Sequence, residues 1–401
     1  MTDVGRSSIV SNADFLEEKI RGWRRDIHSN PELSFHEYET SDYIAKVLEP
    51  IQGISIQRNI AGTGIVATLG TGESPIVALR ADMDALPIIE KNSHSFVSRT
   101  EGVMHACGHD AHTSILLGAA QILSEYFMKE RPTGTIRFLF QPAEESADES
   151  GMTGAPYMIQ AGVLNGVQAA VALHMNPESP VGEIWVNDGY SMANVDNFRG
   201  VILGKGGHAA YPHLTVDPIW MLASVLQALH GIVSRRISPL KSAVVSIGQI
   251  HSGTTSNVIP TEVIVEGTLR SYDPQVREAL IEEVERAFSV ARVLGGDYRF
   301  ELVRGEPALY NDPQVNQVIT DAISTLYPNS KITRVPFGLG GEDFGHMTQK
   351  ISGAMFFLGC QLPDGIVRGL HTPEFDIDER ILPMGAAILA ETARRLLTAV
   401  L

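Results

Sequence analysis

The chain has 401 residues, of which 44% are hydrophobic, and it carries a formal net charge of −16. That length exceeds what one ordinary hydrophobic core supports and predicts two domains. The acidic surplus argues against nucleic acid or an anionic membrane surface as a partner. Cys107 and Cys360 are too few for a disulfide framework, Met1–Asn12 lacks the pattern of a secretory signal, and no apolar run approaches the roughly 20 residues of a membrane helix. We therefore expect a cytoplasmic protein with no membrane or nucleic-acid partner.

The first predicted element is an amphipathic helix that starts after two capping candidates, Ser11 and Asn12. Its apolar residues recur at helical spacing, at Leu16, Ile20, Trp23 and Ile27. Four short, almost wholly apolar runs follow along the chain. Such runs are typical of strands in a mostly parallel sheet with helices on both faces, so they predict an α/β fold. The runs are Ile76–Leu79, Ile136–Phe140, Ala169–Leu173 and Met355–Leu358.

The pattern changes between about Asn194 and Arg304, where strands and helices follow one another in the order βαββαβ. This order is that of a ferredoxin-like α+β domain. We expect residues 194–304 to form such a domain, inserted into a larger one made of residues 1–193 and 305–401. The predicted elements are Asn197–Leu203, Pro218–Val233, Ala243–Ile250, Glu262–Leu269, Pro274–Leu294 and Tyr298–Val303, with a closing helix Met384–Val400 in the larger domain.

Polar side chains follow three of the apolar runs. Asp82 and Asp84 come directly after the first run. Glu144 and Glu145 come after the second, and His174 ends the third. Sites in open α/β sheets gather just beyond the carboxyl ends of the strands, so we expect these groups to lie together.

The stretch Met104–His112 places a thiol, three imidazoles and a carboxylate within nine residues. Thiolate and neutral imidazole bind borderline transition metals strongly, and Cys107-x-His109 offers one of each. Polar groups this dense at the start of an apolar helix cost desolvation free energy unless something binds them. We predict a metal site with the candidate ligands Cys107, His109, Glu145, His174 and His371. Among the other histidines, His105 and His112 are interpreted as groups that orient the ligands, and His94 and His346 as ordinary core or surface imidazoles.

The adjacent carboxylates Glu144 and Glu145 indicate a division of roles. Neighbouring carboxylates repel unless a cation lies between them, and consecutive side chains point in different directions. One can therefore bind metal while the other takes a proton from a metal-bound water and passes it to a leaving nitrogen. The alternative is a solvated acidic turn that continues through Asp148 and Glu149.

Six motifs in chain order resemble those of a known family. They are Arg80–Pro87, Met104–His112, Gln141–Glu145, Gly204–His213, Gly341–Phe344 and Leu370–Thr372. The series is similar to that of the aminoacylase/carboxypeptidase G metallopeptidase family, in particular its amidohydrolase branch of hippurate hydrolases, N-acyl-amino-acid deacetylases and indole-acetyl-amino-acid hydrolases. The resemblance implies a di-metal catalytic domain (residues 1–193 and 305–401) and a smaller lid domain (194–304) through which such enzymes usually form homodimers.

The resemblance also implies roles for individual residues. Glu144 matches the general base and acid, and Asp84 matches the carboxylate that orients a metal-ligating group. His208 matches a lid histidine that helps to hold the developing oxyanion, often reaching across the dimer. Asn257 and Arg270 match substrate-contacting positions, and Arg270 is suited to bind a carboxylate bidentately. The positions that match metal ligands are Cys107, His109, Glu145, His174 and His371.

Together these features predict a hydrolase that cleaves the amide bond of an N-acyl amino acid or related small amide by Glu144-assisted attack of a metal-bound water. Two divalent ions are implied: the thiolate and imidazoles favour zinc, and the carboxylates leave manganese, cobalt and nickel open. The segment Ser146–Gly154 is longer and more acidic than the turn usual in the family, so the substrate stays open. Two alternatives remain, namely hydrolysis of another C–N bond (in a dipeptide, or by deamination of an aromatic amine) and a catalytically silent binding protein.

Overall fold

The computed structural model describes residues 3–399, which fall into two compact units. The first unit comprises the chain up to Gly189, Tyr310–Phe337 and the part from Asp343 onward, and the second comprises Tyr190–Leu309 and Gly338–Glu342. The sequence puts its boundaries a few residues away, at 193/194 and 304/305, and assigns residues 338–342 to the larger domain. That short segment groups with the second unit because the backbone N–H of Ala193 donates to Gly340 O at 2.9 Å.

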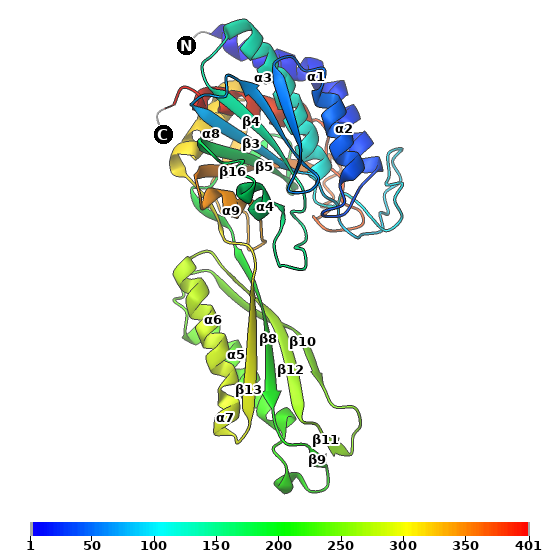
Figure 1. The fold of residues 1–401 in the computed structure, drawn as a ribbon, viewed down its shortest axis with the longest axis vertical. Coiled ribbons are helices and arrows are strands. Elements are labelled where there is room, and N and C mark those ends of the chain that lie inside the picture. The colour runs from blue at the N-terminus through cyan, green and yellow to red at the C-terminus, as the bar shows by residue number, and fades with distance from the viewer. Residues whose placement is uncertain (1–2, 400–401) are drawn as a thin grey trace. The chain divides into compact units, whose positions relative to one another are not determined.

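The first unit is built on an eight-stranded sheet with the strand order β1-β2-β4-β3-β5-β16-β6-β15 (Figure 1). The four apolar runs lie in its central strands β4, β3, β5 and β16, which pair with one another in parallel. The predicted α/β class with a mostly parallel sheet is therefore confirmed. The strands are β1 Ile54–Ile60, β2 Gly64–Gly70, β3 Ile76–Asp82, β4 Thr135–Gln141, β5 Val167–Pro180, β6 Glu183–Trp185, β15 Lys331–Thr333 and β16 Ser352–Gln361.

Helices lie on both faces of this sheet. α3 and α10 pack on one face with α1 and α8 against them, and the short helices α4 and α9 lie on the other (Figure 1). Leu79 of β3, Phe138 of β4 and Ile115 of α3 are fully buried in the core between the sheet and the long helices. The helices are α1 Asp3–Ser29, α2 Tyr38–Leu48, α3 His109–Glu130, α4 Gly154–Gln160, α8 Pro313–Leu326, α9 Phe344–Thr348 and α10 Ile381–Leu396.

Two helix ends differ from the prediction. α1 already includes the proposed caps Ser11 and Asn12, and Asn12 Nδ2 donates to Glu125 Oε2 at 2.8 Å. Ser11 and Asn12 therefore lie within the helix and do not cap its start. α10 begins before the predicted Met384, since Pro383 is tolerated in a first helical turn. Its predicted last residue, Val400, lies outside the described residues.

The second unit is a four-stranded antiparallel sheet with the order β10-β12-β8-β13 and helices on one face, which is the predicted ferredoxin-like arrangement. Asp217 and Asp273 accept hydrogen bonds from the first turns of α5 and α6, and a proline follows each cap. The second predicted helix is interrupted at Ser289. The elements are β8 Asn194–Leu203, β9 Gly207–His208, a 3-10 turn Pro212–Leu214, α5 Pro218–Arg235, β10 Ala243–Ser252, β11 Val258–Ile259, β12 Glu262–Ser271, α6 Pro274–Phe288, α7 Val290–Val293 and β13 Asp297–Arg304, with β7 Gly189–Met192 and β14 Leu309–Asn311 where the chain passes between the units.

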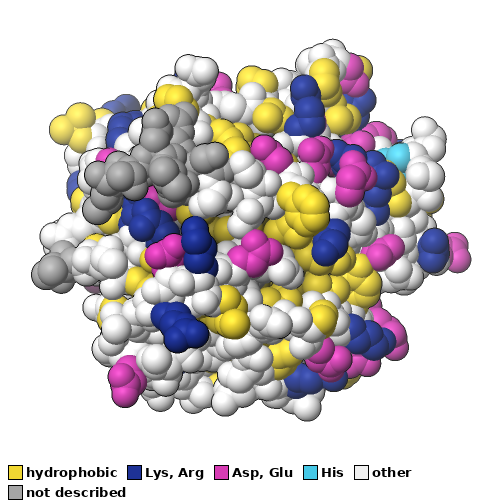
Figure 2. Space-filling model, turned by 90° about the horizontal axis from the view of Figure 1, so that it is seen from above, with side chains coloured by type: hydrophobic (Ala, Val, Ile, Leu, Met, Phe, Trp, Pro, Cys, Tyr) yellow, Lys and Arg dark blue, Asp and Glu magenta, His cyan; other side chains and the backbone are white. Residues whose placement is uncertain are grey.

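Acidic and basic side chains are interspersed over the face seen in Figure 2, with small apolar areas between them. Within residues 3–399, no helix combines the length and apolar character needed to cross a membrane. Cys107 and Cys360 are both buried and free.

Candidate metal centre

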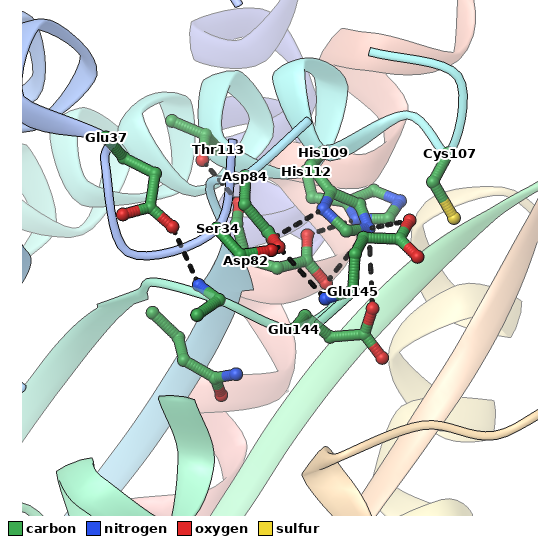
Figure 3. A network of polar contacts seen from close by, with 12 residues as sticks. Ser34, Glu37, Asp82, Asp84, Cys107, His109, His112, Thr113, Glu144 and Glu145 are labelled. Atoms are coloured by element: carbon green, nitrogen blue, oxygen red, sulfur yellow. Dashed lines mark hydrogen bonds and ion pairs between the residues drawn. The ribbon is translucent and has the colours of Figure 1, made fainter. Parts of the chain in front are cut away.

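The predicted site lies where β3 and β4 end and α3 begins (Figure 3). His174 joins it from within β5, which continues to Pro180 and does not end at the site as the sequence predicted. Asp82 is the last residue of β3, and His109 is the first residue of α3. Gly108 precedes the helix with φ +91°, and a Cβ there would lie 2.8 Å from Met175 Cγ. Glycine therefore allows this tight turn, which brings Cys107 and His109 to the same place.

The five predicted ligands come together in space. Cys107 Sγ lies 3.4 Å from His174 Nε2. Glu145 Oε1 lies 3.3 Å from His371 Nε2 and 3.7 Å from His109 Nε2. The donor atoms of Cys107, His109 and His174 all lie within 4.8 Å of one another, and so do those of Cys107, Glu145 and His371. One sulfur, three imidazole nitrogens and a carboxylate thus converge.

Hydrogen bonds distinguish a ligand-ready histidine from an orienting one. His174 Nδ1 donates to Met175 O at 2.8 Å, so its Nε2 keeps a lone pair toward Cys107. Burial holds the pKa of His174 well below its usual range, which keeps the ring neutral. His112 Nε2 instead accepts from Met175 N at 2.9 Å, and its Nδ1 donates to Asp82 at 2.6 Å. Both nitrogens of His112 are engaged, which agrees with the predicted orienting role.

The carboxylate of Asp84 holds three neighbouring segments. Its Oδ1 lies 3.1 Å from His109 Nδ1, and its Oδ2 accepts from Ser34 Oγ at 2.6 Å and from the backbone N–H of Glu145 at 2.9 Å. The contact with His109 Nδ1 directs the other ring nitrogen, Nε2, toward the cluster. A carboxylate behind a histidine in this way is the usual outer support of a metal ligand.

Two buried atoms in the cluster show that these residues fit a cation. His109 Nε2 and Glu145 Oε1 have no hydrogen-bond partner among the described residues. Such atoms cost desolvation free energy unless a ligand satisfies them. Sulfur, imidazole and carboxylate donors together suit divalent ions of the zinc to manganese range.

The electrostatics point the same way. Burial raises the pKa of the Cys107 thiol far above its usual range, and the charges of Glu145 and Glu144 raise it further. Burial alone would lower the pKa of His109, yet Asp82 and Asp84 raise it to about 10. The pocket therefore concentrates negative charge that binds protons when no other cation is present. A divalent ion can replace those protons.

Glu144 lies at the edge of the cluster and diverges from Glu145 (Figure 3). Its Oε2 is 4.0 Å from His109 Nε2, and its Oε1 accepts from the backbone N–H of Asp343 at 3.4 Å. Its side chain is 11% exposed, so it reaches both the cluster and solvent. This position suits proton transfer.

The sequence analysis missed Glu37, which supports the segment that carries both glutamates. Glu37 Oε1 accepts from the backbone N–H groups of Phe35 at 3.0 Å and Ala143 at 2.8 Å. Phe35 and Ala143 have φ values of 65° and 51°, a left-handed conformation that is unfavourable outside glycine. Burial and the nearby charge of Asp84 raise the pKa of Glu37 to about 7. Glu37 lies far from the metal motifs in sequence, so no local pattern indicated it.

A second buried network, also missed, surrounds Arg80. Its guanidinium donates to Asp82 Oδ2 and Asp343 Oδ1, each at 2.7 Å, and to Gln141 Oε1 at 2.9 Å. Gln141 Nε2 donates to Asp343 in turn. The network fixes Asp82, which orients His112, and Asp343, whose N–H contacts Glu144.

The remaining predicted residues lie at two different places in the second unit. His208 and Asn257 lie together at the β9/β11 ribbon, where Ala209 N donates to Asn257 O at 3.1 Å. His208 is exposed, and its Nδ1 accepts from Ala210 N at 3.0 Å. Arg270 lies at the other end of β12, because it pairs with Val195 whereas Glu262 pairs with Leu203. That register separates it from the ribbon by roughly 26 Å of strand.

Comparisons with known proteins identify the family of this chain. The model of the family described as peptidase family M20/M25/M40 matches residues 78–395. The N-acetyl-L-cysteine deacetylase of Bacillus subtilis is 40% identical over 394 residues, 96% of this chain and 90% of the relative. The IAA-amino acid hydrolase ILR1-like 4 of Arabidopsis thaliana is 36% identical over 396 residues, 97% of this chain and 88% of the relative. The crystal structure of the Bacillus subtilis YXEP protein, described as a dinuclear metal binding peptidase, has a TM-score of 0.84 at 35% identity and covers 96% of this chain and 100% of its own.

Replacing Cys107 by alanine should weaken metal binding. Loss of an outer support alone typically costs about tenfold or more in affinity, so loss of a direct ligand should cost at least that. Competition with a chromogenic zinc chelator measures the change. Cys360→Ala is the matched control, because it also removes a buried free thiol. Equal zinc affinities in the two variants would exclude Cys107 as a ligand.

Glu37→Ala should lower the zinc affinity about tenfold. The backbone N–H groups of Phe35 and Ala143 then lose the carboxylate oxygen that both of them contact, and this oxygen holds the segment that leads to Glu144. Glu37→Gln should keep an affinity near that of the parent, since the amide oxygen can accept the same two bonds. The same chelator competition distinguishes them. A loss of similar size in Glu37→Gln would assign the effect to the charge and not to the hydrogen bonds.

Proposed function

The chain belongs to peptidase family M20/M25/M40, and we propose that it hydrolyses the amide bond of small N-acyl amino acids with two divalent metal ions. The resemblance of its sequence motifs to this family is confirmed. The prediction that the protein is an enzyme that acts on small amide bonds is confirmed as well. The observation that carries the proposal is the cluster of converging donors, buried except for His371, with His109 Nε2 and Glu145 Oε1 unsatisfied, beside Glu144.

The ions would be held by the five converging donors Cys107, His109, Glu145, His174 and His371. When bound, they polarise the amide carbonyl and lower the pKa of water. We propose zinc first, because thiolate and imidazole favour it, with manganese, cobalt and nickel as alternatives. Asp84 keeps His109 in its ligating orientation, and His112 steadies Met175 beside His174.

Glu144 acts as general base and then as general acid. Its carboxylate accepts a proton from the water whose oxygen attacks the carbonyl carbon. The bond between that carbon and the amide nitrogen then breaks, and Glu144 delivers the proton to the nitrogen, so that a carboxylic acid and an amine are released. The contact of Glu144 Oε1 with Asp343 N supports this role, because it holds the side chain at the edge of the cluster.

The residues of the second unit complete the substrate site in this proposal. His208 stabilises the developing oxyanion with Asn257 near the substrate, and Arg270 binds the substrate carboxylate. The roughly 26 Å of strand between Arg270 and the ribbon exceeds the length of a small N-acyl amino acid. We therefore propose a homodimer through the second unit, in which His208 and Asn257 serve the neighbouring subunit's site.

A cytoplasmic location is also part of the proposal. Both cysteines are free, and Cys107 must stay reduced to bind metal. The acidic segment after Glu145 is an ordered turn in which Asp148 accepts from the backbone N–H groups of Ser150 and Met152. We propose that this turn shapes the pocket for the acyl or amine group.

Replacing Glu144 by glutamine should leave metal content unchanged and lower turnover of an N-acetyl amino acid on the order of a hundredfold or more, because the amide cannot accept the proton. Turnover is followed by release of free amine, and metal by mass spectrometry. Glu178→Gln, an exposed change on β5, is the control. Turnover near that of the parent would refute the role of Glu144, and loss of metal would make it a ligand instead.

A panel of substrates tests the reaction class. The metal-loaded enzyme should release amine from acetyl, benzoyl or indole-acetyl amino acids faster than from dipeptides, and should not release ammonia from aromatic amines. Steady-state rates on each compound provide the measurement. Faster cleavage of dipeptides or ammonia release would assign the site to another C–N bond, and no turnover of any compound would favour a silent binding protein.

A further inference from the structure

A second cluster of metal-ligating side chains lies in the first unit and shares no residue with the catalytic cluster. It joins His28, which is fully buried near the end of α1, to Glu90 and His94 in the segment that follows β3. We propose that His28, Glu90 and His94 bind a third divalent ion of the zinc class, which ties this segment to α1.

The donor atoms already have the spacing of a metal site. Glu90 Oε1 lies 3.2 Å from His28 Nε2 and 3.3 Å from His94 Nε2, and all three donor atoms lie within 4.8 Å of one another. Ligand atoms around a tetrahedral zinc with ordinary bond lengths are roughly 3.4 Å apart. Two imidazoles and a carboxylate leave the fourth position for water.

His28 has the outer support of a metal ligand. Its Nδ1 lies 2.8 Å from Asp110 Oδ2, which directs Nε2 toward Glu90 and His94. Asp110 is itself held by the buried Arg24, whose Nε donates to the same oxygen at 2.8 Å. A carboxylate that fixes the tautomer and direction of a histidine is a recurrent feature of metal sites.

His94 is the residue that ordinary hydrogen bonding leaves unexplained. The sequence analysis interprets it as an ordinary imidazole, but neither of its ring nitrogens has a hydrogen-bond partner among the described residues. Its ring stacks on Phe96 with centroids 3.7 Å apart, which holds Nε2 beside Glu90. Both ring nitrogens are buried, although the His94 side chain as a whole is 17% exposed.

The charges of the cluster favour a cation. Burial alone would lower the pKa of His28, yet Asp110 and Glu90 raise it. Burial would likewise raise the pKa of Glu90, but His28 and the N–H of Ser98 bring it to about 2. Arg24 acts in the opposite direction, because its charge lowers the pKa of His28 and His94, but it is itself paired with Asp110 and Glu379. A divalent ion can therefore take the place of the second proton on His28.

Counting bound zinc tests the proposal without depending on the proposed function. The parent, His94→Leu and His230→Leu are stripped of metal, dialysed against buffered micromolar zinc, and measured by mass spectrometry and for amide hydrolysis. His230 is an exposed histidine on α5, so its variant controls for surface binding. We expect His94→Leu to bind one zinc fewer per chain with hydrolysis within about twofold of the parent, and His230→Leu to match the parent in both.

The opposite outcomes overturn the site. An unchanged zinc count in His94→Leu would leave His28 as a protonated bridge between Asp110 and Glu90, with no ion. Loss of one zinc in His230→Leu as well would make the extra ion adventitious. Should His94→Leu fail to fold, Glu90→Gln removes the shared carboxylate and is judged by the same count. An inactive parent that still loses one zinc on the His94 change would refute the proposed function and leave this site standing.

Discussion

The carboxylate of Asp84 is the contact on which the catalytic cluster depends. It joins His109 on α3, the backbone of Glu145 after β4 and Ser34 before α2, three segments that come from distant parts of the chain. Burial alone would raise the pKa of Asp84, but the hydrogen bonds from His109 and Ser34 lower it and keep it ionised. One buried anion thus sets both the direction of a ligand and the position of the glutamate pair.

The surrounding fold bears the cost of this arrangement. The left-handed conformation at Ala143, just before Glu144, costs roughly 1–3 kcal/mol. The hydrogen bond from its backbone N–H to the buried carboxylate of Glu37 stabilises it. A thiol, a glutamate pair and two aspartates share one pocket, so their repulsion opposes folding until protons or metal ions neutralise it. Stability and metal binding in the first unit are therefore coupled through the same side chains.

How far the sequence predicts this site depends on how local each signal is. Cys107-x-His109 and Glu144-Glu145 lie beside their strands and helix, so residue type and position indicated them together. The central strands could be predicted equally well, because buried parallel strands are continuously apolar. Glu37 contacts Ala143 106 positions away, and Arg80 contacts Asp343 263 positions away. Such pairs are created by the fold, and no spacing along the chain indicates them. The grouping of His94 with Glu90 and His28 was not indicated for the same reason, since these residues meet only in space.

The first turn of α3 links the two clusters of the first unit. His109 faces the catalytic donors, and the next residue, Asp110, faces His28. Consecutive residues of a helix point about 100° apart, so one turn can serve two sites on different sides. Asp110 is held by Arg24 without any ion, and His109 is held by Asp84. The loss of an ion bound by His28, Glu90 and His94 would therefore leave the catalytic donors in place.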